Sequence, residues 1–374
     1  MNLKYKKLGE VCEILDSRRI PITASERKAG QYPYYGANGI QDYVADFIFD
    51  DELVLLAEDG GNFGSSDRPI AYRVSGKCWV NNHAHVLKPL PGIDVDYLCY
   101  ALMFYDTSGL VNGATRQKLT QAAMRQMEIP IRSWDEQKTI VKKIKSAAGL
   151  IALRKSQVQK LDQLASSRFI EMFGDPVTNS MNWKIHQLSD YIEFLTSGSR
   201  GWSQYFSSSG NYFIAIKNVR NGALSLENVQ FVVPPDNAEA KRTKVEEGDL
   251  LISITADLGR TAVVSKEIAQ YGGYINQHLS CVRLNRQVLE PVYVATFLES
   301  DAGRRQFSAK NQSAVKAGLN FDSIRSLLIP VPPLSRQRAF VSFIEQLDKS
   351  KVTIRKSIEK LETTYRALLQ EYFG

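Results

Sequence analysis

The sequence predicts an α+β protein with a pseudo-twofold internal repeat. Two globular mixed α/β domains, residues 1–130 and 175–328, are separated by two long helices, residues 131–174 and 329–374, which we expect to pair. Three observations lead to this prediction. A long run of residues occurs twice, its apolar residues have one helical period, and each copy follows a stretch of short strand-like segments and turns. Such a repeat constrains the fold more than any single motif does.

The run from Ile129 to Gly174 recurs 200 residues later without a gap. Weaker matches at the same offset lie upstream, at Ala114, Leu119 and Arg125. The clearest matching pairs are Ile129-Pro130 and Ile329-Pro330, Gln137 and Gln337, Lys160-Leu161 and Lys360-Leu361, and Phe173-Gly174 and Phe373-Gly374. The run is better preserved than the domains, so we expect packing to constrain it.

Each copy contains an apolar seam with alternating steps of four and three residues, which is typical of helices that pair in a coiled coil. Roughly 38 residues at about 1.5 Å each make a helix about 57 Å long. Arg154, Arg168 and Lys351 interrupt the seam, where they can set its register or cover it with their stems. The seam positions are Ile140, Ile144, Ala147, Ile151, Arg154, Val158, Leu161, Ala165, Arg168 and Met172, and Phe340, Ile344, Leu347, Lys351, Ile354, Ile358, Leu361, Tyr365, Leu368 and Tyr372.

The positive charge is concentrated in the long helices. The 374 residues carry a net charge of +7, and the sequence pI is about 9.0. Residues 132–173 contain nine Lys or Arg and four Asp or Glu, and residues 332–373 contain eight and five. A basic helical surface suits nucleic acid or an acidic partner protein. A solvated helix face of mixed charge is the alternative.

Composition favours a cytoplasmic protein. The cysteines Cys12, Cys78, Cys99 and Cys281 are scattered without a CxxC pair, which favours reduced thiols over metal binding or disulfides. No apolar run reaches the ~18 residues of a membrane span, and the N-terminus has no apolar signal core. We therefore expect no membrane partner.

The two domains have related patterns. In the first, Asn38-Gly39 favours a tight turn, and we expect strands at 53–57, 70–74 and 78–80, a loop at 58–64, a short helix at 97–104 and a polar loop at 113–119. In the second, Leu188 follows Leu8 by 180 residues, and Ile275-Asn276-Gln277-His278 resembles Val80-Asn81-Asn82-His83 at an offset of 195. The growing offset predicts insertions, which we expect to be loops around 199–245.

Catalytic motifs are few. The sequence contains neither a phosphate-binding G-x-x-x-x-G-K-[ST] loop nor a G-x-G-x-x-G dinucleotide motif. Glu239-Ala240-Lys241 has the form of part of a nuclease metal site, but Pro235-Asp236 lies too close to complete one. His83 and His85 are two residues apart and would share one face of a strand. With no third ligand evident, hydrogen bonding is the favoured role and metal binding the alternative.

The remaining polar loops carry the groups that recognise bases and phosphates. Asn and Gln suit adenine, and Arg and Lys suit guanine and phosphate. Aromatic rings in the same regions could stack or line a groove. As turn formers, caps or solvated side chains, the same residues would have purely structural roles. The candidate DNA contacts are Arg116, Gln117, Lys118, Asn82, His83, Tyr34 and Tyr35 in the first domain, and Lys316, Asn320, Gln277, His278 and Trp202 in the second.

Taken together, these features resemble the specificity subunit of type I restriction–modification systems. The resemblance covers essentially the whole chain and depends on two domains that each precede a long helix. The helices open with Ile129-Pro130-Ile131-Arg132-Ser133-Trp134-Asp135-Glu136-Gln137 and Ile329-Pro330-Val331-Pro332-Pro333-Leu334-Ser335-Arg336-Gln337. The segment Tyr32-Pro33-Tyr34-Tyr35-Gly36-Ala37-Asn38-Gly39 is similar to one frequent in the family's target-recognition domains. The first copy departs from the pattern by lacking Pro-Pro, and the second by replacing Asp-Glu with Ser-Arg.

The resemblance implies a non-catalytic, sequence-specific DNA-binding subunit of a DNA methyltransferase and endonuclease complex that acts in phage defence. Each domain would recognise one half of a bipartite target, and the two helices, paired as an antiparallel coiled coil, would hold the domains apart. Two methyltransferase subunits, contacted through Gln137 and Gln337, would bring S-adenosylmethionine. A restriction and translocase subunit would use ATP and Mg. The chain itself would hold no cofactor.

Two alternatives remain open. A coiled-coil scaffold could display two sugar- or protein-binding domains, and absence of DNA binding by the reconstituted complex would favour it. An enzyme could use His83 or His278, in which case replacing both with alanine would abolish an activity of the isolated chain.

Overall fold

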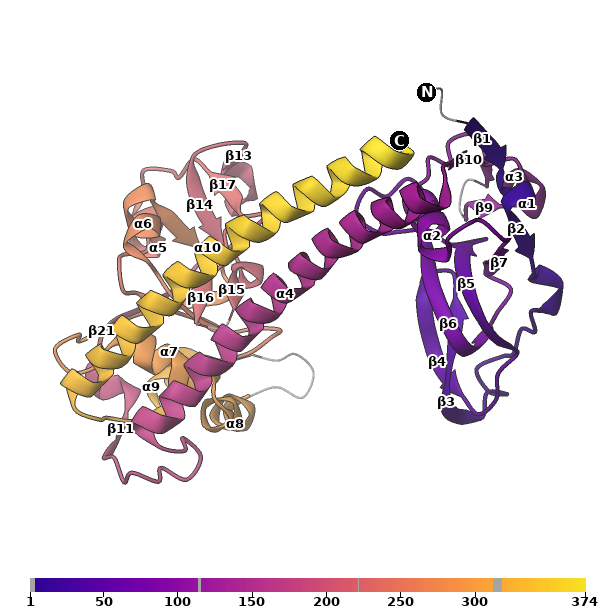
Figure 1. Ribbon diagram of the computed structural model, residues 1–374. Helices are drawn as coiled ribbons and strands as arrows, with labels where there is room; N and C mark the ends of the chain where they lie inside the picture. The colour runs from indigo at the N-terminus through magenta and orange to yellow at the C-terminus, as the bar shows by residue number, and fades with distance from the viewer. Residues whose placement is uncertain (1–3, 114–115, 221, 312–317) are drawn as a thin grey trace. The chain divides into compact units, whose positions relative to one another are not determined.

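The computed structural model describes residues 4–113, 116–220, 222–311 and 318–374. The chain divides into two units (Figure 1). Unit 1 comprises residues 1–157 and 354–374, and unit 2 comprises residues 158–353. Each unit therefore contains one domain, the first part of the long helix that follows this domain, and the last part of the other long helix.

Unit 1 is built around a six-stranded sheet with the strand order β2-β7-β5-β6-β3-β4. Its strands are β2 (Cys12–Ile14), β3 (Ala29–Gly36), β4 (Gly39–Val44), β5 (Phe49–Ala57), β6 (Ala71–Val80) and β7 (Ala84–Pro89). Neighbouring strands are antiparallel, except that β3 and β6 run parallel. The tight turn predicted around Asn38-Gly39 joins β3 to β4.

Both faces of this sheet are covered. Val54 and Leu56 of β5 pack in one apolar cluster with Leu98 and Leu102, while Leu53 and Leu55 pack in another. A strand buried on both faces has a continuous apolar sequence, and the prediction at 53–57 is confirmed. The strands expected at 70–74 and 78–80 form the single strand β6, because its ladder with β5 continues from Ala71 to Cys78.

Short elements complete the first domain. They are β1 (Lys4–Lys7), α1 (Leu8–Val11), the 3-10 turn η1 (Asp16–Arg18), α2 (Val95–Met103), β8 (Val111–Asn112), β9 (Lys118–Leu119), α3 (Gln121–Arg125) and β10 (Glu128–Ile131). The predicted short helix is α2, which begins after Asp94. The Asp94 carboxylate caps it by accepting hydrogen bonds from the backbone N–H groups of Asp96 and Tyr97, each at 3.0 Å.

Unit 2 contains two four-stranded sheets, ordered β12-β21-β18-β19 and β13-β17-β14-β20. The first sheet consists of β12 (Ile192–Ser197), β18 (Leu250–Ser253), β19 (Thr261–Val263) and β21 (Leu279–Leu284). The second consists of β13 (Phe206–Ser207), β14 (Asn211–Ile214), β17 (Gln230–Val232) and β20 (Gly273–Ile275). Strands β14 and β20 run parallel, as β3 and β6 do in unit 1.

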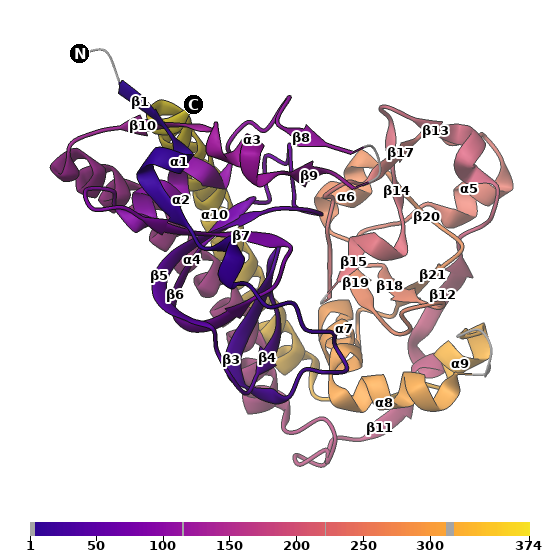
Figure 2. The ribbon, with the colours of Figure 1, turned by 90° about the vertical axis from the view of Figure 1, so that its right-hand side faces the viewer.

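The other elements of unit 2 are mostly short. They are β11 (Ile185–Gln187), η2 (Leu188–Tyr191), η3 (Trp202–Tyr205), η4 (Ile216–Asn218), β15 (Val219–Arg220), β16 (Ala223–Leu224), α5 (Ala238–Thr243), α6 (Lys266–Tyr271), α7 (Pro291–Glu299), α8 (Asp301–Lys310), α9 (Phe321–Arg325) and β22 (Leu328–Pro330). The insertion expected as loops at 199–245 contains the strands β13 to β17 and helix α5 (Figure 2). Its turn residues concealed these short elements in the sequence.

The two domains close in the same way. Strand β1 pairs with β10, and β11 pairs with β22. The backbone N–H of Leu8 donates to the carbonyl of Met127 at 2.7 Å, and that of Leu188 donates to the carbonyl of Leu327 at 2.7 Å. The correspondence predicted between Leu8 and Leu188 is thus confirmed.

Ile129-Pro130 and Ile329-Pro330 lie in strands β10 and β22, so the prediction that they open the long helices is wrong. Each proline carbonyl accepts a hydrogen bond at 2.9 Å from the hydroxyl of Tyr97 or Tyr293. Helix α4 (Trp134–Phe173) begins at a capping box. The Ser133 backbone donates to Glu136 Oε2 at 2.9 Å, and the Glu136 backbone donates to Ser133 Oγ at 3.3 Å. Helix α4 ends at Phe173 and is followed by Gly174, whose φ is +80°.

Helix α10 (Leu334–Phe373) pairs with α4 in the antiparallel direction within each unit (Figure 1). In unit 1, Lys143 Nζ donates to Tyr372 Oη at 3.0 Å, and Lys155 pairs with Glu362 at 2.8 Å. In unit 2, Lys351 Nζ lies 2.8 Å from Asp162, and the Arg168 guanidinium lies 5.6 Å from the Phe343 ring centre. The seam residues Lys351 and Arg168 therefore contact the facing helix.

Near the helix ends, aromatic residues of the long helices pack against each other and against the domains. Phe169 and Phe173 are buried against Tyr293 and Phe340 in unit 2. In unit 1, Phe373 packs edge-on against Tyr97, with ring centres 5.0 Å apart. The predicted seam included neither Phe169 nor Phe173, because there the helix packs against its domain as well as against the other helix. Among the described residues, no helix combines the length and apolarity needed to cross a membrane.

Candidate nucleic-acid interface

Three polar side chains converge at one edge of the first domain, and we call them the His83 cluster: Asp59, His83 and Arg116. His83 Nδ1 donates to Asp59 Oδ1 at 2.6 Å, and Arg116 Nη2 donates to the same oxygen at 2.8 Å. The backbone N–H of His83 donates to Asn81 Oδ1 at 2.8 Å. Asn81 is buried, so it fixes the loop that presents Asn82 and His83.

The neighbouring glycine explains how the loops approach one another. Gly60 has a φ of +61°, a left-handed conformation that glycine adopts without a steric penalty. Its N–H donates to the Gln117 carbonyl at 3.2 Å, and its carbonyl accepts from Asn38 Nδ2 at 3.0 Å. Gly60 therefore links the turn after β3 to the segment that carries Arg116, Gln117 and Lys118.

A second group of charges involves Glu58 and Lys118, which are close to Asp59 and Arg116 in the chain. Lys118 Nζ lies 3.1 Å from Glu58 Oε1, and Arg19 Nη1 lies 2.6 Å from Glu58 Oε2. Arg19 Nη1 also donates to the Ala84 carbonyl at 2.8 Å. The Lys118 side chain is 51% exposed and that of Glu58 is 13% exposed, so the carboxylate is fixed and the ammonium group remains accessible.

Asp16 and His85 support the same loop from inside. His85 Nδ1 donates to Asp16 Oδ2 at 2.6 Å, and His85 Nε2 donates to the Leu119 carbonyl at 2.9 Å. Burial opposes ionisation of Asp16, but hydrogen bonds from His85 and the Val86 backbone, with the charges of His85 and Arg19, hold its pKa below the ordinary 3.8. The ionised carboxylate thus ties β7 to the segment before α3.

The second domain repeats the backbone of this site with other side chains. The N–H of His278 donates to Asn276 Oδ1 at 3.1 Å, as His83 does to Asn81. The N–H of Ile254 donates to the His278 carbonyl at 2.9 Å, and that of Glu58 donates to the His83 carbonyl at 2.9 Å. The similarity predicted between residues 275–278 and 80–83 is confirmed.

The side chains around His278 differ from those around His83. Thr255 Oγ1 lies 2.7 Å from His278 Nδ1, in the place that Asp59 occupies in the first domain. Gln277 Nε2 lies 3.2 Å from His278 Nε2. We call Thr255, Gln277 and His278 the His278 cluster. The two clusters share one loop geometry, but among the described residues a carboxylate and a guanidinium occur in the first cluster alone.

The predicted site residues differ in their exposure. Asn82, Arg116, Gln117 and Lys118 are exposed, and Tyr35, His83, Gln277 and His278 are half-buried. Asn320 is exposed and caps α9, since its Oδ1 accepts from the Ser323 backbone at 2.7 Å. Lys316 lies outside the described residues.

Tyr34 and Trp202 are not available for base stacking, so their predicted roles are wrong. Tyr34 is 1% exposed and Trp202 is 3% exposed. The Trp202 ring packs against Phe213 and Tyr274, and its Nε1 donates to Glu239 Oε1 at 2.8 Å. Glu239 belongs to the sequence pattern that resembles part of a nuclease metal site, and this hydrogen bond gives it a structural role instead. Sequence reasoning failed here because a turn-rich insertion conceals a small aromatic core.

Gln137 and Gln337 are buried, and the prediction that they bind a partner subunit is wrong. Gln137 Oε1 accepts from the Asp94 N–H at 2.9 Å, and its Nε2 donates to the carbonyls of Gly92 and Arg132 at 2.9 and 3.0 Å. Gln337 makes the equivalent three bonds to Glu290, Val288 and Pro332. Each glutamine fixes a long helix to its own domain.

The two histidines do not share a strand face. His83 precedes β7 and is half-buried, whereas His85 lies inside β7 and is 1% exposed. Among the described residues, one group has the spacing of metal ligands: Asp16, Glu58 and His85. The Arg19 guanidinium already pairs with Glu58 at 2.6 Å and lies 3.6 Å from Asp16. A cation of the protein itself therefore supplies the positive charge there.

Asp16, Arg19, Glu58 and Asp59 were absent from the predicted site. Glu58-Asp59 follows a buried strand directly, which is a position where polar groups collect at a sheet edge. Arg19 and Asp16 had no local signal, because their role depends on contacts with residues about 40 to 70 positions away.

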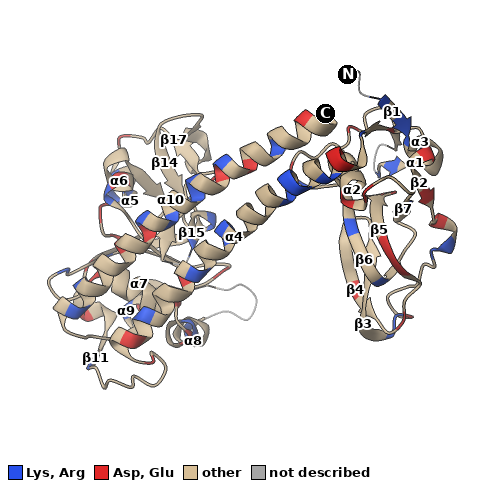
Figure 3. Ribbon diagram, in the orientation of Figure 1, with Lys and Arg blue, Asp and Glu red and all other residues tan. Residues whose placement is uncertain are grey.

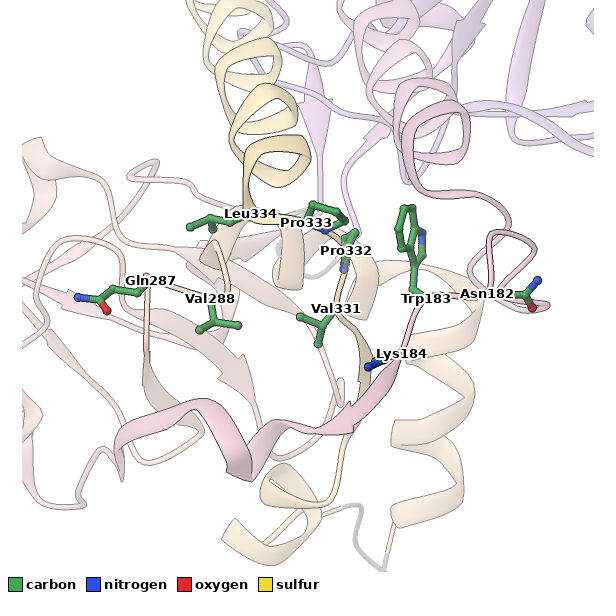
Figure 4. Close-up of a pocket in the computed structure, with 9 residues that line it drawn as sticks. All are labelled: Asn182, Trp183, Lys184, Gln287, Val288, Val331, Pro332, Pro333 and Leu334. Atoms are coloured by element: carbon green, nitrogen blue, oxygen red, sulfur yellow. The ribbon is translucent and has the colours of Figure 1, made fainter.

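A hollow of about 470 Å³ lies in unit 2, at the start of α10, and includes no residue of the His278 cluster (Figure 4). Apolar side chains line most of it, and Lys184 is the one titratable residue among them. Its lining residues are Asn182, Trp183, Lys184, Gln287, Val288, Val331, Pro332, Pro333 and Leu334. Acidic and nucleophilic side chains do not converge there, so this hollow has no features of a catalytic site.

Basic residues are distributed along both long helices (Figure 3). Several are engaged in ion pairs: Lys138 with Asp94 at 2.7 Å, Lys145 with Asp96 at 2.7 Å and Arg338 with Glu290 at 3.0 Å. Part of the positive charge of the helices therefore fixes them to their domains.

Comparisons with known proteins agree in one family. Residues 2–163 and 181–363 match the model for the type I restriction modification DNA specificity domain. A putative type I restriction enzyme specificity subunit of Haemophilus influenzae is 28% identical, over 99% of this chain and 96% of its own length. The specificity subunit of the type I restriction enzyme EcoKI of Escherichia coli is 23% identical, over 82% of this chain and 70% of its own.

Solved structures share the fold. The S subunit of a type I restriction–modification system from M. genitalium has a TM-score of 0.60 at 15% identity, and the match covers 100% of this chain and 96% of that one. A chain from a structure on complex assembly of the type I R-M system has a TM-score of 0.55 at 16% identity, with coverage of 99% and 97%.

Proposed function

Because the chain belongs to the type I restriction–modification DNA specificity family, we propose that each of its domains recognises one half of a bipartite DNA target. The observation that supports this most strongly is the pair of clusters around His83 and His278. Both domains hold a histidine loop through the same Asn-to-backbone hydrogen bond, yet surround it with different side chains. A shared backbone arrangement with different side chains suits two domains that recognise different DNA sequences.

In the first domain, we propose that Asn82, His83, Arg116, Gln117 and Lys118 contact the DNA. Arg and Lys can bind guanine or phosphate, and Asn and Gln can bind adenine in the major groove. Tyr35 is half-buried and is proposed to line the edge of this surface. In the second domain, Gln277 and His278 are proposed to have the equivalent role, with Asn320 at its margin.

The division of labour follows the repeat. We propose residues 1–130 and 175–328 as the recognition domains and residues 131–174 and 329–374 as the segments that set their separation as a coiled coil. Half-sites one turn of DNA apart are separated by about 34 Å. A helix of 40 residues, such as α4 or α10, has a length of about 60 Å. The helices are therefore long enough to span that distance.

The catalytic partners are also part of the proposal. Two methyltransferase subunits would supply S-adenosylmethionine, and a restriction and translocase subunit would supply ATP hydrolysis with Mg, all in the cytoplasm. With Gln137 and Gln337 buried, exposed residues of the helical segments become the candidate contacts. Trp134, which is 48% exposed at the start of α4, is one of them.

Methylome sequencing tests the function. Cells that carry the intact system should contain a bipartite motif with adenine methylation, and the motif should disappear when this chain is deleted. Binding of the corresponding duplex by the reconstituted complex should weaken steeply as salt rises, because phosphate contacts release counterions. A methylome without any motif that depends on this chain would contradict the proposal.

A further inference from the structure

Both cations of the proposed DNA-contacting loop in the first domain are paired with carboxylates of the protein. Arg116 Nη2 lies 2.8 Å from Asp59 Oδ1, and Lys118 Nζ lies 3.1 Å from Glu58 Oε1. The two cationic side chains are 60% and 51% exposed, whereas the two carboxylates are 19% and 13% exposed. The carboxylates are therefore fixed partners, and the cations are groups that can leave them.

Other contacts hold the carboxylates in place independently of the loop. Asp59 Oδ1 also accepts from His83 Nδ1 at 2.6 Å, and Glu58 Oε2 pairs with Arg19 at 2.6 Å. Arg19 is itself anchored by the Ala84 carbonyl at 2.8 Å. Departure of Arg116 or Lys118 would thus leave each carboxylate with a partner, so neither becomes an isolated buried charge.

We infer that Asp59 and Glu58 determine specificity by restraining Arg116 and Lys118 from indiscriminate phosphate contacts. This inference rests on the proposed function. Non-specific DNA binding depends on Lys and Arg that neutralise phosphates, whereas base contacts provide sequence information. A cation that must first leave a carboxylate contributes less to non-specific binding, by the modest free energy of an exposed ion pair. When the correct half-site offers base contacts, the exposed ion pair opens at small cost, because exposed ion pairs contribute little to stability.

The second domain has a different arrangement. Thr255 occupies the place of Asp59 beside the histidine, and Ile254 occupies the place of Glu58. The two carboxylates are thus a feature of the first domain. The inference therefore concerns the first half-site alone, and the second half-site provides an internal reference.

Asp59→Asn is the informative variant. The asparagine keeps an oxygen that can accept from Arg116 and His83, so the loop geometry is preserved while the negative charge is lost. Asp42→Asn is the matched control, because Asp42 is an exposed carboxylate of the same domain that pairs with Arg27 at 3.4 Å. Both variants change the net charge equally, and only one changes the His83 cluster.

The assay uses the complex of the full chain with its methyltransferase subunits. Two duplexes of equal length are compared, one with the motif found by methylome sequencing and one with the first half-site scrambled. D59N should bind the scrambled duplex about two- to fivefold more tightly than the wild type at about 0.1 M salt, with a slope of log K against log salt steeper by about 0.9. Affinity for the intact motif should rise less, so discrimination of the first half-site should fall.

Two results would overturn the inference. In one, D59N and D42N tighten binding of the scrambled duplex equally, which would indicate a general effect of charge. In the other, D59N leaves that binding unchanged or weakens binding of both duplexes in parallel, which would indicate a structural role. In an Arg116→Ala background, the effect of D59N on the scrambled duplex should disappear, and its persistence would also count against the inference. Failure of the proposed function would differ, because the wild type itself would not discriminate between the duplexes.

Discussion

Asp16 is the residue on which many polar contacts of the first domain converge. Its carboxylate accepts from His85 Nδ1 at 2.6 Å, from the Val86 backbone at 2.9 Å and from Gln121 Nε2 at 3.1 Å. These groups belong to β7 and α3, which flank the segment with Lys118. The shape of the proposed DNA-contacting surface of the first domain thus depends on Asp16, a buried side chain that is not proposed to touch DNA.

The lowered pKa of Asp16 predicts acid sensitivity. A carboxyl group whose pKa is lower in the folded than in the unfolded chain stabilises the fold at pH values above its unfolded pKa. This stabilisation is lost as the pH falls below about 4, through the folded pKa. Asp16→Asn should therefore flatten the dependence of the first domain's unfolding free energy on pH in this acidic range, as measured by urea unfolding. An unchanged pH profile in D16N, compared with D42N as a control, would contradict this role.

The four cysteines are free and buried, and we expect their thiols to be unreactive in the folded chain. Burial raises the pKa of Cys12, Cys78 and Cys99 to about 12 and that of Cys281 well above its ordinary value. Because the thiolate is the reactive form, we predict that an aromatic disulfide reagent at neutral pH modifies no thiol rapidly in the folded chain and all four after denaturation. Rapid reaction of any thiol in the folded chain would contradict their placement.

At the scale of elements, the sequence identified the two long helices but assigned the strand residues that precede them to the helices. The 200-residue repeat and the seam predicted α4 and α10, and the family resemblance implied their antiparallel pairing. They did not predict that Ile129-Pro130 belongs to a strand, because the strand's partner, Lys4–Lys7, is more than 120 residues away. The capping box Ser133-x-x-Glu136 was a local signal that could have placed the start of α4 correctly.

The repeated glutamine illustrates the same limit. Its recurrence at 137 and 337 correctly indicated a shared role, but sequence alone could not distinguish an internal clamp from an external contact. Three hydrogen bonds to backbone groups, in a side chain 1% or less exposed, decide for the clamp. The repeated glutamine therefore indicated a position with a constrained role, and its burial in the structure shows that this role is internal.

Gln137→Ala should destabilise the junction between α4 and the first domain. It would leave one backbone N–H and two carbonyl groups without their partner, and unsatisfied buried groups cost about 1–3 kcal/mol each when no water replaces the partner. We expect the free energy of unfolding to fall by about 2–4 kcal/mol in urea titrations, and Q337A should behave similarly. Gln163→Ala, an exposed position on α4, is the control. Equal effects at 137 and 163 would contradict the clamp.

At the scale of the whole molecule, the two halves share their joints and differ in their proposed contacts. The Tyr-to-proline carbonyl bond, the glutamine clamp and the histidine loop occur in both domains. The second domain differs from the first in its insertion at 199–245 and in having Thr255 at the place of Asp59. Repetition was visible in the sequence because packing preserves it. The contacting side chains were less predictable, since loop conformation decides which of them are exposed.

Exchange of one domain tests whether each domain recognises one half-site. Residues 1–130 are replaced by the first domain of another family member, residues 131–374 are kept, and the methylated motif of cells with the otherwise intact system is sequenced. One half of the bipartite motif should change, while the other half and the spacer length remain. A change in both halves, or in the spacer alone, would contradict the claim that each domain recognises one half-site.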